Sequence, residues 1–592
     1  MYILGLNNNH NATAVLLKDG KIVDCVSEER FTNIKNYIGI PRKAIGYILK
    51  KNRLSPHDID LICLGYKYGG PLLTSSEEKR RLGWKLLPLK AIFFIAEKIR
   101  FLFWGLEKYF PILRRVEEIL YKFYVIGFSR KSVEQEKRLL AKFLKIPEEK
   151  IVGFEHHQAH ATAAYFCSPF REKNVLALSL DAEGDLLCST VGIYNEESNY
   201  RRVAATPIGH SLAQIYGDVT RYLGMKPNEH EYKVMGLAPY AKGEGKEKVF
   251  EKIKNWVVLD KDNPLVFRSK FHTRNTYSIL KKEMEGFRFD NIAAGFQKLV
   301  EERVSEWVKQ AIKKTGVKTL VLGGGIFMNV KLNQKISELK EVKEVFFMPS
   351  CGDESTSVGV AFLGYLKLCQ EKRIKPKIVP IKNLYWGPSF SNKEIEKFLR
   401  KYQGRYKIKF LKNPAKTIAK LLAEGKIVAV LQGRMEWGAR ALGNRSILAH
   451  PARPELIRDL NEVVKNRDFW MPFAPSILAE RADDYLVNPK HFSAPFMILA
   501  FDSTPLAKKE LAAAMHPYDF TLRPQVVEKE ANPRYYQIIK EFEKLTGIGG
   551  VLNTSFNLHG YPIVLGPKEA MNVFENSGLQ YLAMENFLIS KV

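Results

Sequence analysis

Residues 1–27, MYILGLNNNHNATAVLLKDGKIVDCVS, decide the expected fold. Apolar residues at strand spacing predict three strands, at residues 2–6, 12–17 and 22–27. The Asp19-Gly20 pair between the last two strands is typical of a tight hairpin turn, so these strands are expected to pair antiparallel. The chain therefore opens with a meander whose first loop is polar.

A first strand, a polar loop and a hairpin are how an actin-like domain begins, with the loop facing the phosphates of a nucleotide. From residue 174 onward strands and helices alternate, with expected strands at 175–180 and 319–322 and a helix over 291–315. A Lys-, Pro- and Ile-rich segment near residues 371–390 then interrupts the pattern and indicates a linker. We therefore expect an α/β protein with two domains, residues 1–375 and 376–592.

The composition is typical of soluble globular proteins, with 46% hydrophobic and 26% charged residues. The 92 Lys and Arg residues outnumber the 64 Asp and Glu residues, and the net charge of +28 would attract polyanions, anionic membranes or phosphorylated small molecules. The six cysteines form no CxxC pair, so neither a thiolate zinc site nor a disulfide framework is expected. The N-terminus has no pattern of a secretory signal, which favours a cytoplasmic location.

Residues from about 70 to 148 crowd apolar, aromatic and basic side chains together and predict a helical insertion in the first domain. No apolar run there approaches the roughly 18 to 20 residues of a membrane-spanning helix. Residues 83–128 could instead pack on their own domain, contact a homodimer partner, or lie peripherally on a membrane surface, and all three alternatives stay open.

The run EHHQAHA predicts a metal site. His156 and His160 are four residues apart, so a helix would place both imidazoles on one face and point His157 elsewhere. Further ligands are expected from Asp181 in SLDAEGD and Asp353 in PSCGDES, because each follows an apolar strand-like run. This donor set suits iron(II), manganese or zinc. A solvated histidine face and helix-capping aspartates are the alternative interpretation.

Two loops of the first domain suit a nucleotide. GGGIFMN follows a buried strand, and its consecutive glycines would let the backbone approach a ligand at Gly323, Gly324, Gly325 and Asn329. Residues 181–185 could present carboxylates towards a phosphate-bound metal ion. Tight turns would explain both loops equally well.

The second domain is rich in cations that suit phosphate, since arginine binds it in a bidentate way and lysine adds a point charge. The loop NTSFN also offers polar groups that could hydrogen-bond a planar amide such as a carbamoyl group. A generic basic segment is the alternative. The candidate binding residues are Arg434, Arg440, Arg445, Lys465, Arg467, Arg523, Asn553 and Ser555.

Taken together, these motifs resemble the carbamoyltransferase family of nodulation and antibiotic-pathway O-carbamoyltransferases, nearly from end to end. The matching pieces, in the family's order, are ILGLNNNHNATAVLLKDG, SEERFTNIK, EHHQAHA, KVMGLAPY, GGGIFMN, GRMEWGARALGNRSILAHP, KNRDFWMPFAPSIL and NTSFNLHGYPIV. The resemblance implies an actin-like (ASKHA) first domain of the duplicated ribonuclease-H type and a YrdC-like α/β second domain.

The resemblance also implies an enzyme with two reactions in one chain. The YrdC-like domain would use ATP, Mg²⁺ and carbamoyl phosphate to form carbamoyl-adenylate, with Arg440 and Lys465 as catalytic residues and Arg523, Asn553 and Ser555 as further contacts. Similarity to the tRNA threonylcarbamoyl transferases implies that the four-residue metal site holds a divalent ion, expected to be iron(II), while GGGIFMN receives adenosine. A hydroxyl of a small-molecule, glycan or lipid-linked acceptor would then attack the carbamoyl carbon.

His10 matches a family histidine near the acceptor and is the candidate general base, with a buried, hydrogen-bonded structural histidine as the alternative interpretation. Three positions depart from the family's pattern: Asn11 replaces an aspartate, and Ala182 and Tyr232 replace glycines. Two other functions stay open. The +28 charge would suit a tRNA threonylcarbamoyl-type enzyme, although the fused domain order makes nucleic acid an unexpected partner, and the insertion would suit a non-catalytic membrane-surface protein on the same fold.

Overall fold

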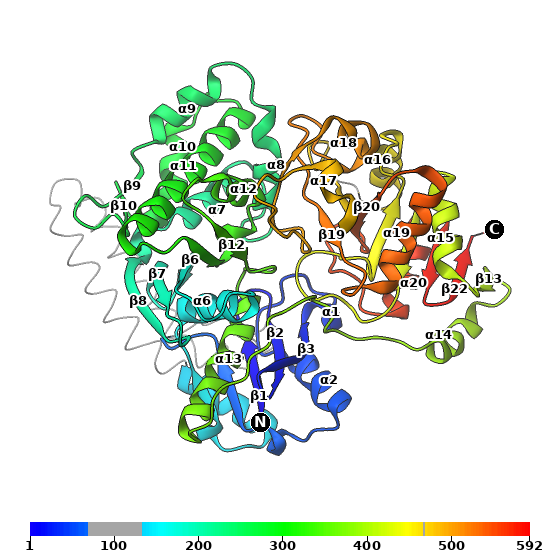
Figure 1. The fold of residues 1–592 in the computed structure, drawn as a ribbon, viewed down its shortest axis with the longest axis horizontal. Coiled ribbons are helices and arrows are strands. Elements are labelled where there is room, and N and C mark those ends of the chain that lie inside the picture. Colours follow the sequence, from blue (N-terminus) through cyan, green and yellow to red (C-terminus); the bar gives the residue numbers. More distant parts are fainter. Residues whose placement is uncertain (69–132, 466–467, 592) are drawn as a thin grey trace.

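The computed structural model describes residues 1–68, 133–465 and 468–591. Within them, the first sheet of the first domain has the strand order β3-β2-β1-β4-β5 (Figure 1). Its strands β1 to β3 form an antiparallel meander, and β4 and β5 continue parallel to β1. The expected meander is thus confirmed, with ends that differ by one residue. The strands are β1 (Tyr2–Asn7), β2 (Thr13–Lys18), β3 (Lys21–Ser27), β4 (Leu61–Leu64) and β5 (Ile151–Gly153).

A second sheet of the same domain, in the order β12-β11-β6-β7-β8, repeats this topology. Strands β6 to β8 are its antiparallel meander, and β11 and β12 run parallel to β6. The two matching halves confirm the duplicated ribonuclease-H-type fold. The strands are β6 (Val175–Gly184), β7 (Leu187–Tyr194), β8 (Tyr200–Pro207), β11 (Thr319–Gly323) and β12 (Glu344–Phe347).

Each half of the first domain contributes one central helix that packs on the sheet of the other half. Helix α6 (His156–Cys167) follows β5 but packs on β6 and β11, whereas α13 (Glu354–Glu371) follows β12 but packs on β1 and β4. The helices approach closely because α6 is rich in alanine and α13 has Gly359, where a Cβ would lie 1.9 Å from the Ala159 carbonyl oxygen. Both N-termini therefore lie close together.

The remaining helices cover the outer faces of the sheets, and α11 confirms the helix expected over 291–315. They are α1 (Glu29–Thr32), α2 (Arg42–Asn52), α7 (Leu212–Tyr222), α8 (Glu231–Leu237), α9 (Gly245–Ile253), α10 (Thr276–Glu283), α11 (Phe289–Thr315) and α12 (Val330–Glu338), with a small hairpin of β9 (Val257–Leu259) and β10 (Phe267–Ser269). Of the expected insertion, residues 133–144 are helical and bury Val133 and Leu140 against the first sheet. Residues 69–132 lie outside the described residues.

The second domain is built on a mixed sheet of eight described strands, in the order β13-β22-β21-β14-β15-β20-β16-β19. Helices α15 and α19 pack together on one face, and α14, α16 and α20 contribute to the apolar cluster on the other. The strands are β13 (Lys407–Phe410), β14 (Val428–Leu431), β15 (Arg445–Ala449), β16 (Ala474–Leu478), β19 (Gln525–Val527), β20 (Gly550–Ser555), β21 (Tyr581–Met584) and β22 (Phe587–Ser590). The helices are α14 (Asn392–Leu399), α15 (Pro414–Ala423), α16 (Glu455–Leu460), α17 (Ala482–Tyr485), α18 (Pro505–Glu510), α19 (Pro533–Thr546) and α20 (Pro567–Glu575), and a two-strand pair joins β17 (Leu486–Val487) to β18 (Asp502–Ser503).

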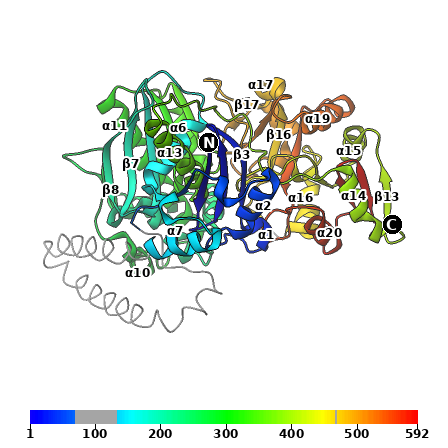
Figure 2. The ribbon, with the colours of Figure 1, turned by 90° about the horizontal axis from the view of Figure 1, so that it is seen from below.

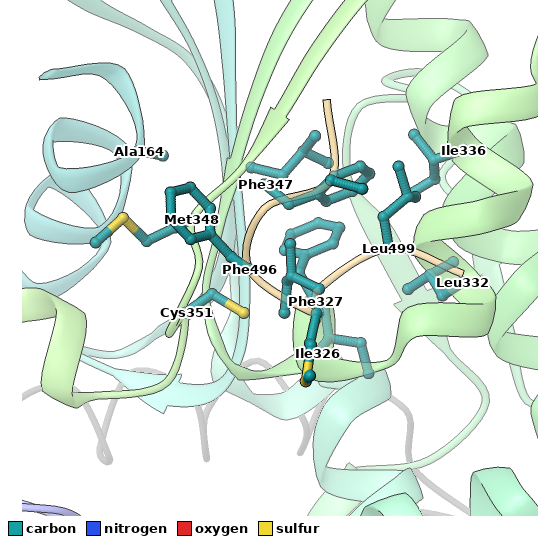
Figure 3. Close-up of a cluster of buried hydrophobic side chains, with 14 of the residues drawn as sticks. Ala164, Ile326, Phe327, Leu332, Ile336, Phe347, Met348, Cys351, Phe496 and Leu499 are labelled. Atoms are coloured by element: carbon teal, nitrogen blue, oxygen red, sulfur yellow. The ribbon is translucent and has the colours of Figure 1, made fainter. Parts of the chain in front are cut away.

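The two domains share an apolar core. A loop of the second domain inserts Phe496 and Leu499 among side chains of the first, including Phe327 and Phe347 (Figure 3). In the same place Asn333 Nδ2 donates to the Ile498 carbonyl over 2.7 Å. The domains lie side by side, with β13 and the C-terminus at the end far from α11 (Figure 2). Among the described residues we find no helix that combines the length and the apolarity needed to cross a membrane.

Candidate functional site

The four side chains expected to bind a metal meet where the halves of the first domain join. The ligand atoms of His156, His160, Asp181 and Asp353 all lie within 4.8 Å of one another. His160 Nε2 is 3.0 Å from His156 Nε2 and 3.2 Å from Asp181 Oδ2, and His156 Nε2 is 3.8 Å from Asp353 Oδ1. The exchange of α6 and α13 between the sheets brings these residues together, with Asp181 supplied by the end of β6.

Hydrogen bonds on the far side of each imidazole orient the two histidines. His156 Nδ1 lies 3.3 Å from the Gly65 carbonyl oxygen, which can only accept, so this nitrogen carries the proton. Nε2 of His156 then keeps its lone pair for the cluster, as a metal-binding histidine requires. His160 Nδ1 lies 2.9 Å from Ser355 Oγ at the start of α13. His157 points away, as expected, with Nδ1 2.9 Å from Ser179 Oγ.

The electrostatics of the cluster fit a divalent cation. Within the described structure no lysine or arginine pairs with Asp181 or Asp353, and two imidazole nitrogens face each other. Burial raises the pKa of Asp353. Burial opposes a charge on His156, yet the Asp353 and Asp181 carboxylates outweigh it and raise the pKa of this histidine. Two imidazole nitrogens and two carboxylates offer ligands of the kind that iron(II), manganese or zinc accepts, and metal binding stays a prediction.

The glycine loop is built around this cluster. A Cβ on Gly323 would lie 2.8 Å from the His160 carbonyl oxygen, and one on Gly325 would lie 3.1 Å from Asp181 Oδ1. Gly324 has a φ of 102°, and a Cβ there would lie 2.3 Å from the Leu180 carbonyl oxygen. Gly325 also donates its N–H to Asp181 Oδ2 over 2.9 Å. The three glycines thus make room for the metal-type ligands, and their contact with adenosine stays a prediction.

Two first-domain residues need a corrected role. Asn329 caps α12 by accepting from Leu332 N over 3.0 Å, and its amide nitrogen donates to Gln297 over 2.9 Å, so its side chain is already occupied. Asp185, expected to face a phosphate-bound metal, instead accepts hydrogen bonds from backbone N–H groups. Sequence reasoning missed this role because all three of its partners are backbone groups distant in sequence.

His10 lies in the loop between β1 and β2, where its carbonyl oxygen accepts from Asn7 Nδ2 over 2.8 Å. Burial raises the pKa of Glu354, the residue next to Asp353, against a hydrogen bond with Ser350 that lowers it. The role of His10 as a general base stays a prediction.

In the second domain, Lys465 reaches the end of β20. Its buried Nζ lies 2.6 Å from Asn557 Oδ1 and 3.2 Å from Ser555 Oγ, which brings two of the predicted residues together. Lys465 ends η8 (Asn461–Lys465), a π-helical turn of a kind often found at functional sites. Arg523 lies just before β19, and Arg467 lies outside the described residues.

Arg440 and Asn553 carry buried polar atoms that the protein leaves unsatisfied. Asn553 Nδ2 donates to the Ala441 carbonyl over 3.2 Å and to Ser476 Oγ over 3.0 Å, so its amide lies against the backbone of the residue that follows Arg440. Within the described residues, Asn553 Oδ1 and Arg440 Nε have no hydrogen-bond partner. Buried groups of this kind are costly unless something binds them. An unpartnered amide oxygen suits the donor of a ligand, and an unpartnered guanidinium N–H suits an anionic acceptor.

The structure assigns the other two arginines of the same segment to structural roles. All three guanidinium nitrogens of the buried Arg445 donate to backbone carbonyls, those of Gln432, Gly433, Asn444, Leu565 and Pro388. Arg434 pairs with the buried Asp24 over 2.6 Å and donates to the Val23 carbonyl, so it ties the second domain to the first. Their expected part in phosphate binding is corrected accordingly.

The two candidate sites face each other across the domain boundary. A Cβ on Gly438 would lie 2.9 Å from the Ser350 Cβ, three residues before Asp353, so the two loops are in direct contact. Arg30 of the first domain donates to the Gly438 carbonyl over 2.8 Å. The segment that carries Arg440 therefore lies against the loop that carries a metal-type ligand.

Comparison with known proteins decides the family. Residues 2–362 match the family model described as "Carbamoyltransferase N-terminus", and residues 419–591 match "Carbamoyltransferase C-terminus". The chain belongs to the carbamoyltransferase family. It is thus an enzyme of carbamoyl transfer, as the sequence motifs indicated.

Several curated proteins are similar to this carbamoyltransferase. An uncharacterized protein of Methanocaldococcus jannaschii, MJ1058, is 33% identical over 76% of this chain and 75% of its own length. The uncharacterized protein sll1178 of Synechocystis is 31% identical over 100% and 97%. Nodulation protein NolNO of Sinorhizobium fredii is 28% identical over 98% and 79%. Among solved structures, full-length HypF aligns at 15% identity over 62% of this chain and 56% of its own, with a TM-score of 0.31, too low to carry an argument.

Proposed function

We propose that this carbamoyltransferase forms carbamoyl-adenylate from ATP and carbamoyl phosphate in its second domain and transfers the carbamoyl group to an acceptor hydroxyl in its first. The observation that carries this proposal is the contact between two incomplete sites. The segment that carries Arg440 lies on one side of the Gly438 contact, and the loop that carries the metal-type ligand Asp353 lies on the other.

In the second domain, the unpaired Asn553 carbonyl oxygen would accept a hydrogen bond from the carbamoyl NH₂ group. The Arg440 guanidinium and the Lys465 ammonium would neutralise phosphate oxygens, with ATP bound as its Mg²⁺ complex. Burial of Arg440 lowers its pKa and strips water from its charge, so a phosphate there would be strongly attracted. Carbamoyl phosphate would lose inorganic phosphate to water and leave carbamate, whose oxygen attacks the α-phosphate of ATP and expels pyrophosphate.

In the first domain, His156, His160, Asp181 and Asp353 would hold a divalent ion, with iron(II) expected. Such an ion supplies a Lewis acid that polarises a carbonyl or neutralises a departing phosphate. His10 would take the proton of the acceptor hydroxyl, which then attacks the carbamoyl carbon while AMP leaves. The buried cluster would limit hydrolysis, since both reactants are held away from bulk water.

The acceptor in this proposal is a hydroxyl of a small molecule, a glycan or a lipid-linked compound. The residues proposed to contact a membrane or a second subunit, 83–128, lie outside the described structure. Mass spectrometry of acceptor extracts incubated with the enzyme would show a gain of one carbamoyl group. Salt-sensitive binding of tRNA would instead favour the tRNA-modifying alternative.

The first test is pyrophosphate release. Purified enzyme with ATP, carbamoyl phosphate and Mg²⁺ should release pyrophosphate, and omission of carbamoyl phosphate should abolish the signal. Absence of pyrophosphate under the complete conditions, with and without candidate acceptors, would overturn the adenylation step.

A further inference from the structure

The carboxylate of Asp185 lies beside the metal-type cluster but outside it. It accepts three backbone hydrogen bonds, from Lys67 N over 2.9 Å, from Tyr68 N over 2.7 Å and from His156 N over 2.8 Å. Lys67 and Tyr68 follow β4 in the first half of the domain, whereas Asp185 belongs to the turn between β6 and β7 in the second. One carboxylate therefore joins both halves to the first residue of α6.

The backbone around Asp185 adopts an uncommon conformation to make these bonds. Asp185 has a φ of 46° and Leu186 a φ of 71°, so two successive residues other than glycine lie in the left-handed region. Such a conformation costs free energy and persists only where surrounding contacts enforce it. The register of β6 with β7 also shifts between Leu180 and Gly184. The irregular turn aims the Asp185 carboxylate at α6.

The same turn packs directly on the ring of His156. A Cβ on Gly184 would lie 2.1 Å from His156 Cδ2 and 2.8 Å from its Nε2, the nitrogen that faces the cluster. Only glycine leaves room for the imidazole in its present position. Asp181, at the other end of residues 181–185, supplies a carboxylate to the cluster itself. Five consecutive residues thus contribute one metal-type ligand and fix the position of another.

The N-terminus of α6 is held by two carboxylates with different tasks. The helix cap Glu155 accepts from Gln158 N over 2.7 Å and from His157 N over 3.2 Å, which satisfies N–H groups that have no partner within the helix. Asp185 takes the remaining N–H, that of His156. A negative charge is favourable at a helix N-terminus, so both carboxylates anchor the helix there. Asp185 alone reaches across to the opposite half of the domain.

We infer that Asp185 is a positioning residue that fixes His156 in the geometry needed to bind a divalent cation with the other three ligands. The inference rests on the metal site of the proposed function and adds a role for a residue that does not contact the ion. When Asp185 is replaced by Asn, the amide offers one acceptor oxygen in place of two, so at least one N–H loses its partner and an NH₂ group meets another donor. His156 then shifts away from the cluster.

The test measures Mn²⁺ binding by the full-length enzyme, with the paramagnetic resonance signal of free Mn²⁺ as the readout. Asp185→Asn should weaken Mn²⁺ binding about 10- to 100-fold, the usual effect of removing a group that orients a metal ligand. Pyrophosphate release in the second domain should stay unchanged, because no residue of that site is altered. The matched control is Asp290→Asn, another buried carboxylate that accepts a backbone N–H, from Asn291 over 2.9 Å, which should leave Mn²⁺ affinity unchanged.

A second variant tests the packing of the same turn without touching a charge. Gly184→Ala should also weaken Mn²⁺ binding, since the new Cβ displaces the His156 ring. Equal Mn²⁺ affinity in the wild type and both variants would overturn the positioning role. Loss of pyrophosphate release together with Mn²⁺ binding would also overturn it, since Asp185 would then support the whole fold. If the wild type itself binds no Mn²⁺, the metal site of the proposed function fails, and the positioning role fails with it.

Discussion

The metal-type cluster of the first domain and the arginine-rich segment of the second differ in how sequence relates to space. The four cluster residues span 198 positions from His156 to Asp353, yet their ligand atoms converge within 4.8 Å. The three arginines of GRMEWGARALGNRSI lie within twelve positions, yet their guanidinium groups diverge to different partners. Closeness in sequence therefore did not indicate a shared site.

Arg445 and Arg440 differ in whether their polar atoms are already satisfied. Every guanidinium nitrogen of Arg445 donates to a backbone carbonyl, whereas the buried Nε–H of Arg440 has no hydrogen-bond partner in the described structure. In the cluster, the Nε2 atoms of His156 and His160 face each other at 3.0 Å. Unsatisfied buried groups cost free energy, so the Arg440 N–H is a candidate point of contact for a ligand.

The strongest test of the difference between the two sites is to block pyrophosphate release and carbamoyl transfer separately. If the proposed function holds, Lys465→Ala should reduce pyrophosphate release about 100-fold or more, because the ammonium proposed to neutralise the phosphates is lost. His160→Ala should leave pyrophosphate release nearly unchanged and reduce carbamoyl transfer to the acceptor by a similar factor. Pyrophosphate assays and mass spectrometry of the acceptor distinguish these outcomes. If both variants fail at the same step, the two sites do not divide the chemistry.

Substitutions of Arg445 and Arg440 should give the next largest effects, on stability and on pyrophosphate release respectively. Arg445→Ala should lower the free energy of unfolding by about 3 kcal/mol, since several backbone carbonyls lose their donor and a cavity forms. Arg440→Ala should leave the melting temperature nearly unchanged and reduce pyrophosphate release. Thermal unfolding and the pyrophosphate assay should therefore rank the two variants in opposite order. The same rank in both measurements would contradict the distinction.

The glycine loop offers a test within the first domain. Gly324→Ala should destabilise the protein by about 1–3 kcal/mol, because the φ of 102° is unfavourable for alanine and its Cβ would lie 2.3 Å from the Leu180 carbonyl oxygen. Chemical denaturation measures the change. Gly316→Ala is the matched control, because its φ is also positive, at 73°, but no atom lies within 4 Å of its Cβ position. Equal destabilisation would show that crowding at the cluster adds nothing.

The smallest effect concerns pH. Burial of Glu229 opposes its charge, but Lys226 and Lys35 outweigh burial and lower its pKa from 4.5 to about 2. Because the folded pKa lies below the ordinary value, the stabilisation is present above pH 4.5 and is lost as the pH falls towards 2. Lys35 Nζ lies 2.8 Å from Glu229 Oε1 and joins the two halves of the first domain. Glu229→Gln should be less stable than the wild type at pH 7, and acid unfolding should show this difference vanishing near pH 2.

Much of the fold could be predicted from local patterns. Period-two apolar residues and the Asp19-Gly20 turn located the opening meander, and the apolar periodicity of 291–315 located α11 to within two residues. The pairing of the second sheet and the exchange of α6 and α13 could not be read from such patterns, because they depend on contacts between distant segments. The family resemblance implied only the duplicated ribonuclease-H-type architecture.

The candidate site was predictable where side-chain chemistry is distinctive. Two histidines at helical spacing and two aspartates after apolar strands are an unusual donor set, and the structure brings them together. The prediction failed for Arg445 and Asn329. The sequence alone does not distinguish an arginine that donates to backbone carbonyls, or an asparagine that caps a helix, from an arginine or asparagine that binds a ligand. The role of Asp185 as an acceptor of backbone hydrogen bonds was missed for a related reason, since any residue type can supply a backbone N–H group.

The insertion of Phe496 and Leu499 into the first domain has a consequence for how this protein could be divided. A gene split in the linker after residue 375 would produce a first half with Phe327, Ile336 and Phe347 newly exposed to water. Such a fragment would be prone to aggregate and would need its missing half during synthesis. An exchange of the second domain for another would therefore have to preserve the packing of the loop around residues 494–501 on the first domain.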